Sequence, residues 1–416
     1  MTPSTAFAQA LVPICTRAGS GTVAGMPTRS KTAALADRHL RHATGSRLVE
    51  GFAGGQEVLR CPALAQGGVG GDPSREGGAA AAAAGGEHPS VFFLDGEPHK
   101  RRRAAIARFF TPRAITTRHR AVMERATDDL LAGLRRRGGG RLDDVSFRLA
   151  VAVAAEIVGL VESDQRALAR HVSGALRGAR VPGMRPAVRW LGAAAAAASA
   201  GLFYLRDVRP ALRARRAERR EDVISHLLDE GYPDRAILIE CLTYGAAGMI
   251  TTREFIVVAA WHLFEDDALR ERFLDGDEPF QTAVLEEILR LEPVASVLHR
   301  RAAQDAELGT GDAREGDVLA VSVRAANLDE AAVGACPHDI DPDRVRARGV
   351  GGAALSFGDG AHRCPGANVA LQETRVFLDR LLRLPGIRLV REPTVRWVDE
   401  LGSYEVRGAV VACDRG

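Results

Sequence analysis

The longest apolar pattern in the chain runs from Asp234 to Phe264, where hydrophobic residues recur with little polar interruption. At 1.5 Å per residue, a helix of this length would extend roughly 46 Å. A helix that is apolar on most of its sides has to be buried. The pattern therefore predicts one long helix that crosses the interior of the molecule.

Other segments show shorter regular patterns. Residues from Ala367 to Leu382 place apolar side chains three and four positions apart, which predicts an amphipathic helix. The alanine-rich run Ala193–Ala200 and the basic run Arg209–Arg220 also favour helix. Short stretches such as Asp317–Val323 and Tyr404–Val411 alternate as strands do. The predicted fold class is mainly α with small β-sheets.

Two segments lack hydrophobic periodicity. Between Cys61 and Ser90, glycine and alanine fill 16 of 30 positions, which predicts a long loop of the kind that often covers a functional site. Residues 1–35 contain no acidic side chain and are predicted to be a disordered leader, with Met26 as an alternative start. The remaining residues, 36–416, are predicted to form a single domain around a large core.

Composition narrows the class of protein. The net charge of +3 gives no support for a nucleic-acid-binding function. The six cysteines are scattered without a Cys-x-x-Cys pair, which favours a reducing compartment over a zinc or dithiol site. No run approaches the roughly 18–20 apolar residues that span a bilayer. The stretch Ala6–Ile14 lacks the basic residue that precedes a signal peptide core. We expect a cytoplasmic protein with no membrane partner.

The strongest chemical signal is the segment Phe357–Gly366, with the sequence Phe-Gly-Asp-Gly-Ala-His-Arg-Cys-Pro-Gly. Its glycines permit backbone conformations and close approaches that other residues do not. Cys364 lies just before the predicted helix that starts at Ala367, where free N–H groups favour an anionic sulfur and lower the thiol pKa. The segment therefore presents one thiolate to a metal. An inert cysteine in a glycine-rich turn is the alternative.

This segment resembles the haem-binding loop of the cytochrome P450 family, Phe-Gly-x-Gly-x-His-x-Cys-x-Gly, at every constrained position. The resemblance implies a cytochrome P450-like fold of the soluble bacterial type, and haem b as the cofactor. It makes Cys364 the axial ligand of the haem iron. A thiolate ligand favours cleavage of the O–O bond. The loop residues that the resemblance assigns to haem binding are Phe357, Gly358, His362 and Gly366.

Inside the long apolar pattern stands Ala247-Gly-Met-Ile-Thr-Thr252. Small residues let a flat cofactor approach the helix, here at Ala247 and Gly248, and a threonine hydroxyl can bond to the helix backbone or to bound water. The string is similar to the family motif Ala/Gly-Gly-x-acid-Thr, which implies catalytic roles for Thr251 and Thr252. Ile250 occupies the usual acid position. Since isoleucine cannot relay protons, proton delivery must use water and the two threonines, or the reaction needs less of it.

Two charged sets take their roles from the same resemblance. Glu287, Arg290 and Arg344 are expected to form a buried structural network, although Glu57 and Arg60 show the same spacing as Glu287 and Arg290. Another set is expected to bind the haem propionates, because guanidinium groups hold carboxylates bidentately. That set consists of His99, Arg103, Arg300 and His362. A solvated basic helix is the other interpretation of His99 and Arg103.

Basic residues that remain could form a surface that attracts an acidic electron donor, or simply a solvated charged face. They are Lys100, Arg101, Arg102, Arg108, Arg113 and Arg363. The chain contains neither a flavin motif nor an iron–sulfur cysteine cluster. The electrons are therefore expected to come from a ferredoxin and a ferredoxin reductase.

The resemblance implies a monomeric enzyme that hydroxylates or epoxidises a hydrophobic small molecule, in secondary metabolism. The isoleucine at position 250 motivates an alternative, oxidative coupling of aromatic peptides or cyclodipeptides without oxygen insertion. A non-catalytic haem-thiolate binder or sensor is a further alternative. The residues expected to shape the substrate pocket are Ala246, Ile250, Val294 and Val297. The sequence does not specify the substrate.

Overall fold

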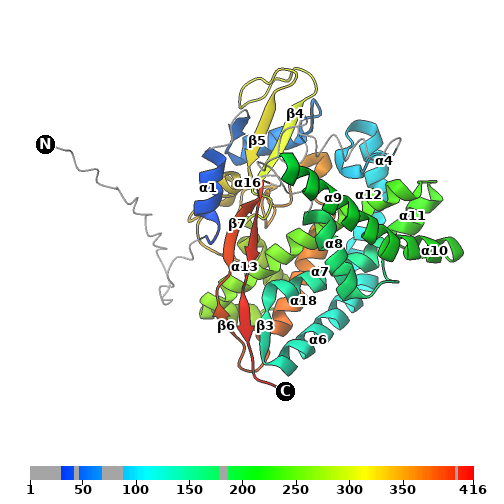
Figure 1. The fold of residues 1–416 in the computed structure, drawn as a ribbon. Helices are drawn as coiled ribbons and strands as arrows, with labels where there is room; N and C mark the ends of the chain where they lie inside the picture. The colour runs from blue at the N-terminus through cyan, green and yellow to red at the C-terminus, as the bar shows by residue number, and fades with distance from the viewer. Residues whose placement is uncertain (1–29, 42–45, 68–87, 178–185, 399–401) are drawn as a thin grey trace.

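The computed structural model describes residues 30–41, 46–67, 88–177, 186–398 and 402–416. Helices fill most of the molecule, and the strands lie at its top and along one side (Figure 1). The predicted fold class, mainly α with small β-sheets, is therefore confirmed.

The first half of the chain is mostly helical, and one of its helices, Leu142–Val158, packs against the central helix of the molecule. The helices of this half are α1 (Ala33–Arg41), α2 (Phe52–Arg60), α4 (Gly96–Ala107), α5 (Pro112–Ala114), α6 (Arg120–Arg137), α7 (Leu142–Val158), α8 (Gln165–Arg177), α9 (Pro186–Phe203), α10 (Arg209–Ala217) and α11 (Val223–Asp229). Four short turns connect them: the 3₁₀ turns η1 (Val91–Phe93) and η2 (Arg108–Phe110), and the π-helical turns η3 (Ile115–His119) and η4 (Tyr204–Val208).

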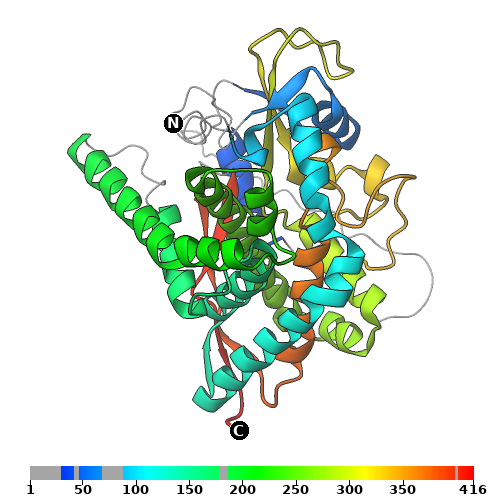
Figure 2. The ribbon, with the colours of Figure 1, turned by 90° about the vertical axis from the view of Figure 1, so that its right-hand side faces the viewer.

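The second half of the chain supplies the central helix, helices that pack against it, and shorter helices elsewhere. They are α12 (Asp234–Tyr244), the π-helical turn η5 (Gly245–Ile250), α13 (Thr251–Glu265), α14 (Asp267–Asp275), α15 (Glu278–Leu291), α16 (Val323–Asn327), α17 (Glu330–Val333), the 3₁₀ turn η6 (Gly360–His362) and α18 (Ala367–Leu382). Helices α14, α15 and α18 pack against α13. The predicted helix Ala367–Leu382 coincides with α18, which lies beside α6 in Figure 2.

The strands form three sheets. The largest has the order β1-β5-β4-β2, with β1 (Arg47–Val49) parallel to β5 (Val318–Ser322), and β4 (Val297–Ala302) antiparallel to β5 and to β2 (Leu64–Gln66). The second has the order β3-β9-β6, with β3 (Gly139–Arg141), β9 (Val410–Ala412) and β6 (Arg388–Arg391). A hairpin of β7 (Thr394–Val398) and β8 (Ser403–Arg407) is the third.

The predicted strand Tyr404–Val411 was wrong as one unit. It divides into β8 and β9, which belong to different sheets. The division falls at Gly408, whose φ of +84° is left-handed and cannot continue a strand. By contrast, the predicted strand Asp317–Val323 is confirmed as β5.

The central helix runs from α12 through η5 to α13, so the prediction of one helical segment over Asp234–Phe264 is confirmed. The sequence did not predict its π-helical turn at Gly245–Ile250. A π turn bonds residue i to residue i+5, widens the helix locally and is frequent at functional sites. On α13 all residues from Thr252 to Leu263 are buried, as the apolar pattern requires. Helices α7 and α18 pack against it.

The structure describes only the last residues of the predicted leader. Residues 1–29 lie outside the described residues, but Ser30 and Thr32 donate hydrogen bonds to the buried carboxylate of Glu292, and α1 starts at Ala33. In the predicted loop between Cys61 and Ser90, residues 64–66 form β2, while 68–87 lie outside the described residues.

The structure also bears on the cysteines and on membrane-spanning segments. Cys61, Cys241, Cys364 and Cys413 carry free thiols, but Cys336 takes part in a disulfide, which the scattered spacing did not predict. In the part of the chain that the structure describes, no helix combines the length and the apolar character needed to cross a membrane.

Candidate functional site

The loop around Cys364 is held in place by its own backbone and by α2. The Cys364 N–H donates to the carbonyl of Phe357 over 2.8 Å, which closes the loop. Asp359 accepts the Gly360 N–H at 2.7 Å and also binds Gln56 at 2.8 Å. Gly360 has a φ of +67°, and a Cβ there would lie 2.4 Å from the carbonyl oxygen of Leu59. Only glycine fits this approach, so the glycine pattern of the sequence has a direct structural cause.

The sulfur of Cys364 lies three residues before α18, as the sequence predicted, and its side chain is exposed. The direction of its pKa shift is the reverse of the expected lowering. Surrounding protein atoms desolvate the thiol and raise its pKa, and the Gly366 N–H, Arg103 and Arg363 oppose this only in part. A bound metal ion would act in the opposite direction, because its positive charge favours the thiolate.

The middle of the central helix has an open face. Ala247 and Gly248 are exposed, although the α13 residues that follow from Thr252 are buried. A Cβ at Gly248 would meet no atom within 4 Å. Thr251 donates its hydroxyl to the Ala247 carbonyl at 2.5 Å, and Thr252 is buried. A flat group has room to lie against Ala247 and Gly248 at this point.

Arg103 lies on α4 and connects α4 to the cysteine loop. Its guanidinium donates to the carbonyl of Arg363 in the loop. Burial lowers the pKa of Arg103, while the nearby Cys364 and Tyr244 act in the opposite direction. Tyr244 is the last residue of α12, three positions before Ala247. The cysteine loop and the open part of the helix therefore both lie close to Arg103.

His99 and His362, predicted to act together, are in contact. Their rings stack with centroids 4.1 Å apart, and His99 is only 3% exposed. Burial, with the nearby positive charges of His362 and Arg103, lowers the pKa of His99 to about 4. His99 is therefore neutral near pH 7 and is not part of a solvated basic helix.

Arg300 completes the predicted set from β4. It is 4% exposed and donates to the side-chain oxygen of Gln66 at 2.6 Å and to the His299 carbonyl at 2.9 Å. Burial lowers its pKa to about 10, and only Asp95 acts in the opposite direction. A buried guanidinium with so little compensation suits an anionic ligand.

Sequence reasoning missed Asp95. Its carboxylate bonds to Nε2 of His362 at 2.9 Å and accepts the Gln66 N–H at 3.1 Å. Burial by itself would raise the pKa of Asp95, but these hydrogen bonds lower it overall. The signal was present in the sequence, since Asp95 stands four residues before His99 and precedes the first residue of α4.

The predicted charge network is present and larger than predicted. Glu287 and Arg290 are both 0% exposed and form two hydrogen bonds of 2.9 and 3.0 Å. Arg344 binds the same carboxylate at 2.9 Å, and Arg346, which the sequence did not suggest, binds it at 2.7 Å. The arginines also donate to main-chain carbonyls, including that of Asp339. Despite burial, these partners lower the pKa of Glu287, so it is ionised at neutral pH.

The four residues expected around the substrate differ in their exposure. Val294 and Val297 are buried, and Ala246 is half-buried. Ile250 lines a cavity of about 470 Å³ whose other walls are mostly charged. Those walls are Arg141, Asp143, Asp144, Phe147, Ser173, Arg253, Arg396, Glu405 and Arg407.

The donor set favours a cofactor over a bare metal ion. Among the described residues, no group of three or more His, Cys, Asp and Glu side chains lies together as a metal site would require. The site instead offers what an iron porphyrin needs. It has the sulfur of Cys364, the small residues Ala247 and Gly248, and buried cationic side chains such as Arg300. These supply one axial ligand, room for a flat ring, and partners for the porphyrin carboxylates.

Comparison with known proteins agrees with this geometry. The profile of the cytochrome P450 family matches residues 277–384. Nocardicin C N-oxygenase of Nocardia uniformis subsp. tsuyamanensis is 30% identical over 313 residues, covering 73% of this chain and 74% of that protein. The mycinamicin IV hydroxylase/epoxidase of Micromonospora griseorubida is 28% identical over 319 residues, covering 73% of this chain and 75% of that protein.

The fold comparison points the same way. The crystal structure of CalO2 superposes with a TM-score of 0.76 at 24% identity, covering 93% of this chain and 96% of that one. The chain therefore belongs to the cytochrome P450 family, and it is an oxidoreductase of the monooxygenase class.

Proposed function

We propose that the protein is a haem-thiolate monooxygenase that binds haem b through Cys364 and oxidises a hydrophobic small molecule in secondary metabolism. The observation that carries the proposal is the position of Cys364, an exposed residue in a loop that backbone and side-chain hydrogen bonds hold at the start of α18. When bound, the haem would supply dioxygen activation with two electrons. Hydroxylation or epoxidation is the expected reaction, because relatives include a hydroxylase/epoxidase and an N-oxygenase.

In this proposal the buried cations hold the cofactor's carboxylates. Arg300 is desolvated and lacks a full negative partner, so a propionate would restore charge balance. Arg103 and the stacked pair of His99 and His362 complete the polar side of the site. The ring would lie against Ala247 and Gly248, where an added Cβ at Gly248 meets no protein atom. Phe357, Gly358 and Gly366 shape the loop that carries the ligand sulfur.

The threonines would handle protons at the oxygen site. Thr251 already gives its hydroxyl proton to the Ala247 carbonyl, so its oxygen remains an acceptor for water or another donor. Thr252 is buried and is expected to support the turn around it. Ile250 cannot pass a proton from the charged cavity that it lines. Proton supply would therefore depend on water held by Thr251.

A ferredoxin and its reductase would supply the electrons. The enzyme would act as a monomer in the cytoplasm. Five of the six basic residues proposed to attract the donor are consistent with an open surface, since Lys100, Arg101, Arg108, Arg113 and Arg363 are exposed. Arg102 is the exception, because it lies over the ring of Tyr232 and donates to a main-chain carbonyl.

Oxidative coupling of aromatic peptides or cyclodipeptides is the second candidate, and the position of Ile250 favours it. Ile250 belongs to the central helix and also lines a cavity with mostly charged walls. An acidic side chain at this position could pass protons from the cavity to the oxygen site, whereas isoleucine cannot. A reaction in which two substrate radicals combine places no oxygen atom in the product. It would therefore tolerate a poor proton supply better than hydroxylation.

The first experiment tests the cofactor ligand. The reduced, carbon-monoxide-bound protein is expected to show the red-shifted band of a thiolate-ligated haem. Cys364→Ala should abolish this band. The matched variant Cys61→Ala, which changes a second free cysteine that is half-buried, should keep it. A thiolate band that survives in Cys364→Ala would contradict the proposed ligand.

The second experiment tests the reaction. Turnover with a ferredoxin and reductase in isotopically labelled dioxygen should place label in the product. A coupled product without label would support the second candidate instead. If no member of a hydrophobic panel that shifts the haem spectrum is oxidised, the protein is a haem-thiolate binder or sensor.

A further inference from the structure

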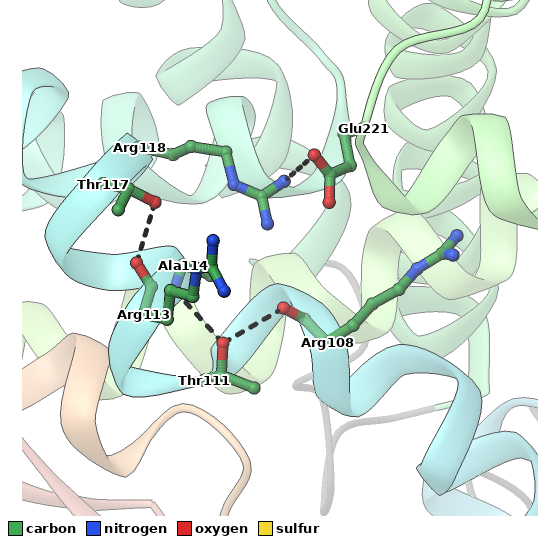
Figure 3. Close-up of a pocket in the computed structure, with 7 residues that line it drawn as sticks. All are labelled: Arg108, Thr111, Arg113, Ala114, Thr117, Arg118 and Glu221. Carbon is green, nitrogen blue, oxygen red and sulfur yellow. Dashed lines mark hydrogen bonds and ion pairs between the residues drawn. The ribbon is translucent and has the colours of Figure 1, made fainter.

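A polar hollow of about 440 Å³ lies where α4 ends and the chain turns into α6 (Figure 3). One side consists of η2, α5 and η3, and the other side is the loop just before α11. The lining residues are Arg108, Thr111, Arg113, Ala114, Thr117, Arg118 and Glu221. Neither the haem site nor the cavity at Ile250 includes any of them.

The backbone brings the basic side chains of this hollow together. Thr111 caps α5 by accepting the Ala114 N–H at 3.1 Å. Thr117 donates to the carbonyl of Arg113 at 2.8 Å within the π-helical turn η3. Because a π turn bonds residues five apart, Arg113 and Arg118 come onto one side, where an ordinary α-helix would separate them. Figure 3 shows both guanidinium groups directed at the same space.

The charges of the hollow are not balanced. Nη1 of Arg118 lies 2.8 Å from a carboxylate oxygen of Glu221, yet this buried nitrogen has no acceptor in hydrogen-bond geometry among the described residues. Arg108 lies against the ring of Phe109 and Arg113 bonds only through its backbone, and neither guanidinium has a carboxylate partner in the described chain. The lining thus contains three arginines and one carboxylate, a net charge of +2, with the guanidinium group of Arg108 directed away from those of Arg113 and Arg118 in Figure 3.

We propose that this hollow is a binding site for a phosphate monoester. A phosphate monoester carries a charge close to −2 at neutral pH, which matches the two uncompensated charges, whereas a single carboxylate would leave one. Planar guanidinium groups bind phosphate oxygens bidentately. The volume exceeds that of a phosphate group alone, so it has space for part of the organic group attached to it. The carboxylate of Glu221 pairs with Arg118 and would compete with the phosphate for this arginine.

The proposal does not depend on the reaction at Cys364. Binding is measured without turnover, so a failure here would leave the proposed haem ligand and reaction untouched. Arg108 and Arg113 also belong to the surface proposed to attract the electron donor, so phosphate and the donor would compete for them. The two sites are nevertheless connected through α4, which carries Arg103 and leads directly into Arg108.

The test is calorimetric titration of the haem-loaded protein with inorganic phosphate and with phenyl phosphate, at constant ionic strength. Arg113→Gln and Arg118→Gln should each weaken phosphate binding about tenfold, the usual effect of losing one charge-assisted contact. Arg125→Gln, at an exposed arginine on the neighbouring helix, is the matched control and should leave the affinity unchanged. Glu221→Gln should strengthen binding several-fold, because it removes the competing anion.

Three results would overturn the proposal. If sulfate and chloride bind as tightly as phosphate and the arginine variants change nothing, the hollow holds an adventitious ion only. If Arg125→Gln weakens binding as much as Arg113→Gln, the effect is general surface charge. If an acidic ferredoxin protects Arg113 from chemical modification while neither phosphate compound does, the hollow is a protein-docking surface.

Discussion

The two sides of the site differ in how firmly the protein holds them. On the side of Cys364, hydrogen bonds close the loop, Asp359 binds α2, and the carboxylate of Glu287 receives three arginines. On the opposite side, Ala247 and Gly248 are exposed on the central helix, and the hydroxyl of Thr251 bonds to a carbonyl of its own helix.

This difference has a chemical meaning. A metal ligand has to stay in one position, so the fold constrains the loop from several directions. The helix has to leave space for a cofactor and for molecules that come and go, so its side chains are small and its turn is widened to a π turn. Changes on the cysteine side should therefore reduce stability, while comparable changes on the helix side should not.

The largest effect is expected in the charge network. Glu287→Gln would leave three arginines around a neutral side chain that is 0% exposed, and stranding buried charges costs about 3–5 kcal/mol. Glu57 occupies the same Glu-x-x-Arg spacing but binds the exposed Gly309 N–H. Glu57→Gln should therefore cost less than about 1 kcal/mol. Urea unfolding of both variants and the parent measures the two free energies.

Similar losses in the two glutamine variants would contradict the comparison, because they would show that sequence spacing, not burial, sets the energy. A second control is the pair Arg60→Gln and Arg344→Gln. Arg60 has a half-exposed side chain and binds Asp359, so its loss should be the smaller one.

Alanine substitutions at Gly360, on the cysteine side, and at Gly248, on the helix side, should differ in their effect on the free energy of unfolding, by less than the glutamate variants do. Gly360→Ala places a Cβ 2.4 Å from the Leu59 carbonyl at a φ of +67°, which should destabilise the protein by roughly 1–3 kcal/mol. Gly248→Ala meets no atom and has helical geometry, so it should not lower the free energy of unfolding. Thermal unfolding reports both, and the haem content of each purified variant should be recorded in parallel.

If Gly248→Ala unfolds as readily as Gly360→Ala, the helix face is not open in the protein. If it keeps its stability but takes up less haem, the cofactor lies against Gly248 as proposed. The two measurements thus separate a packing role from a binding role for this glycine.

The sequence predicted the regular parts of both sides well. The extent of α18 followed from apolar spacing, and the central helix followed from its unbroken apolar pattern, because burial of side chains determines both. The π turns were not predicted, since an i to i+5 bond leaves no periodic trace in residue type. Arg346 was missed because it reaches Glu287 from a segment without secondary structure, where spacing has no geometric meaning.

The smallest expected effect concerns pH on the cysteine side. His99 has a folded-state pKa of about 4, lowered mainly by burial, against 6.5 when unfolded. The unfolded chain therefore binds a proton more readily, and stability that is complete above pH 6.5 is lost as the pH falls toward 4. Between pH 7.5 and pH 5.5 the loss should be about 1 kcal/mol. His99→Gln cannot titrate, so urea unfolding at both pH values should show a pH dependence smaller by that amount. An unchanged dependence in the variant would mean that His99 binds a proton as readily in the folded protein as in the unfolded chain, so that burial does not lower its pKa.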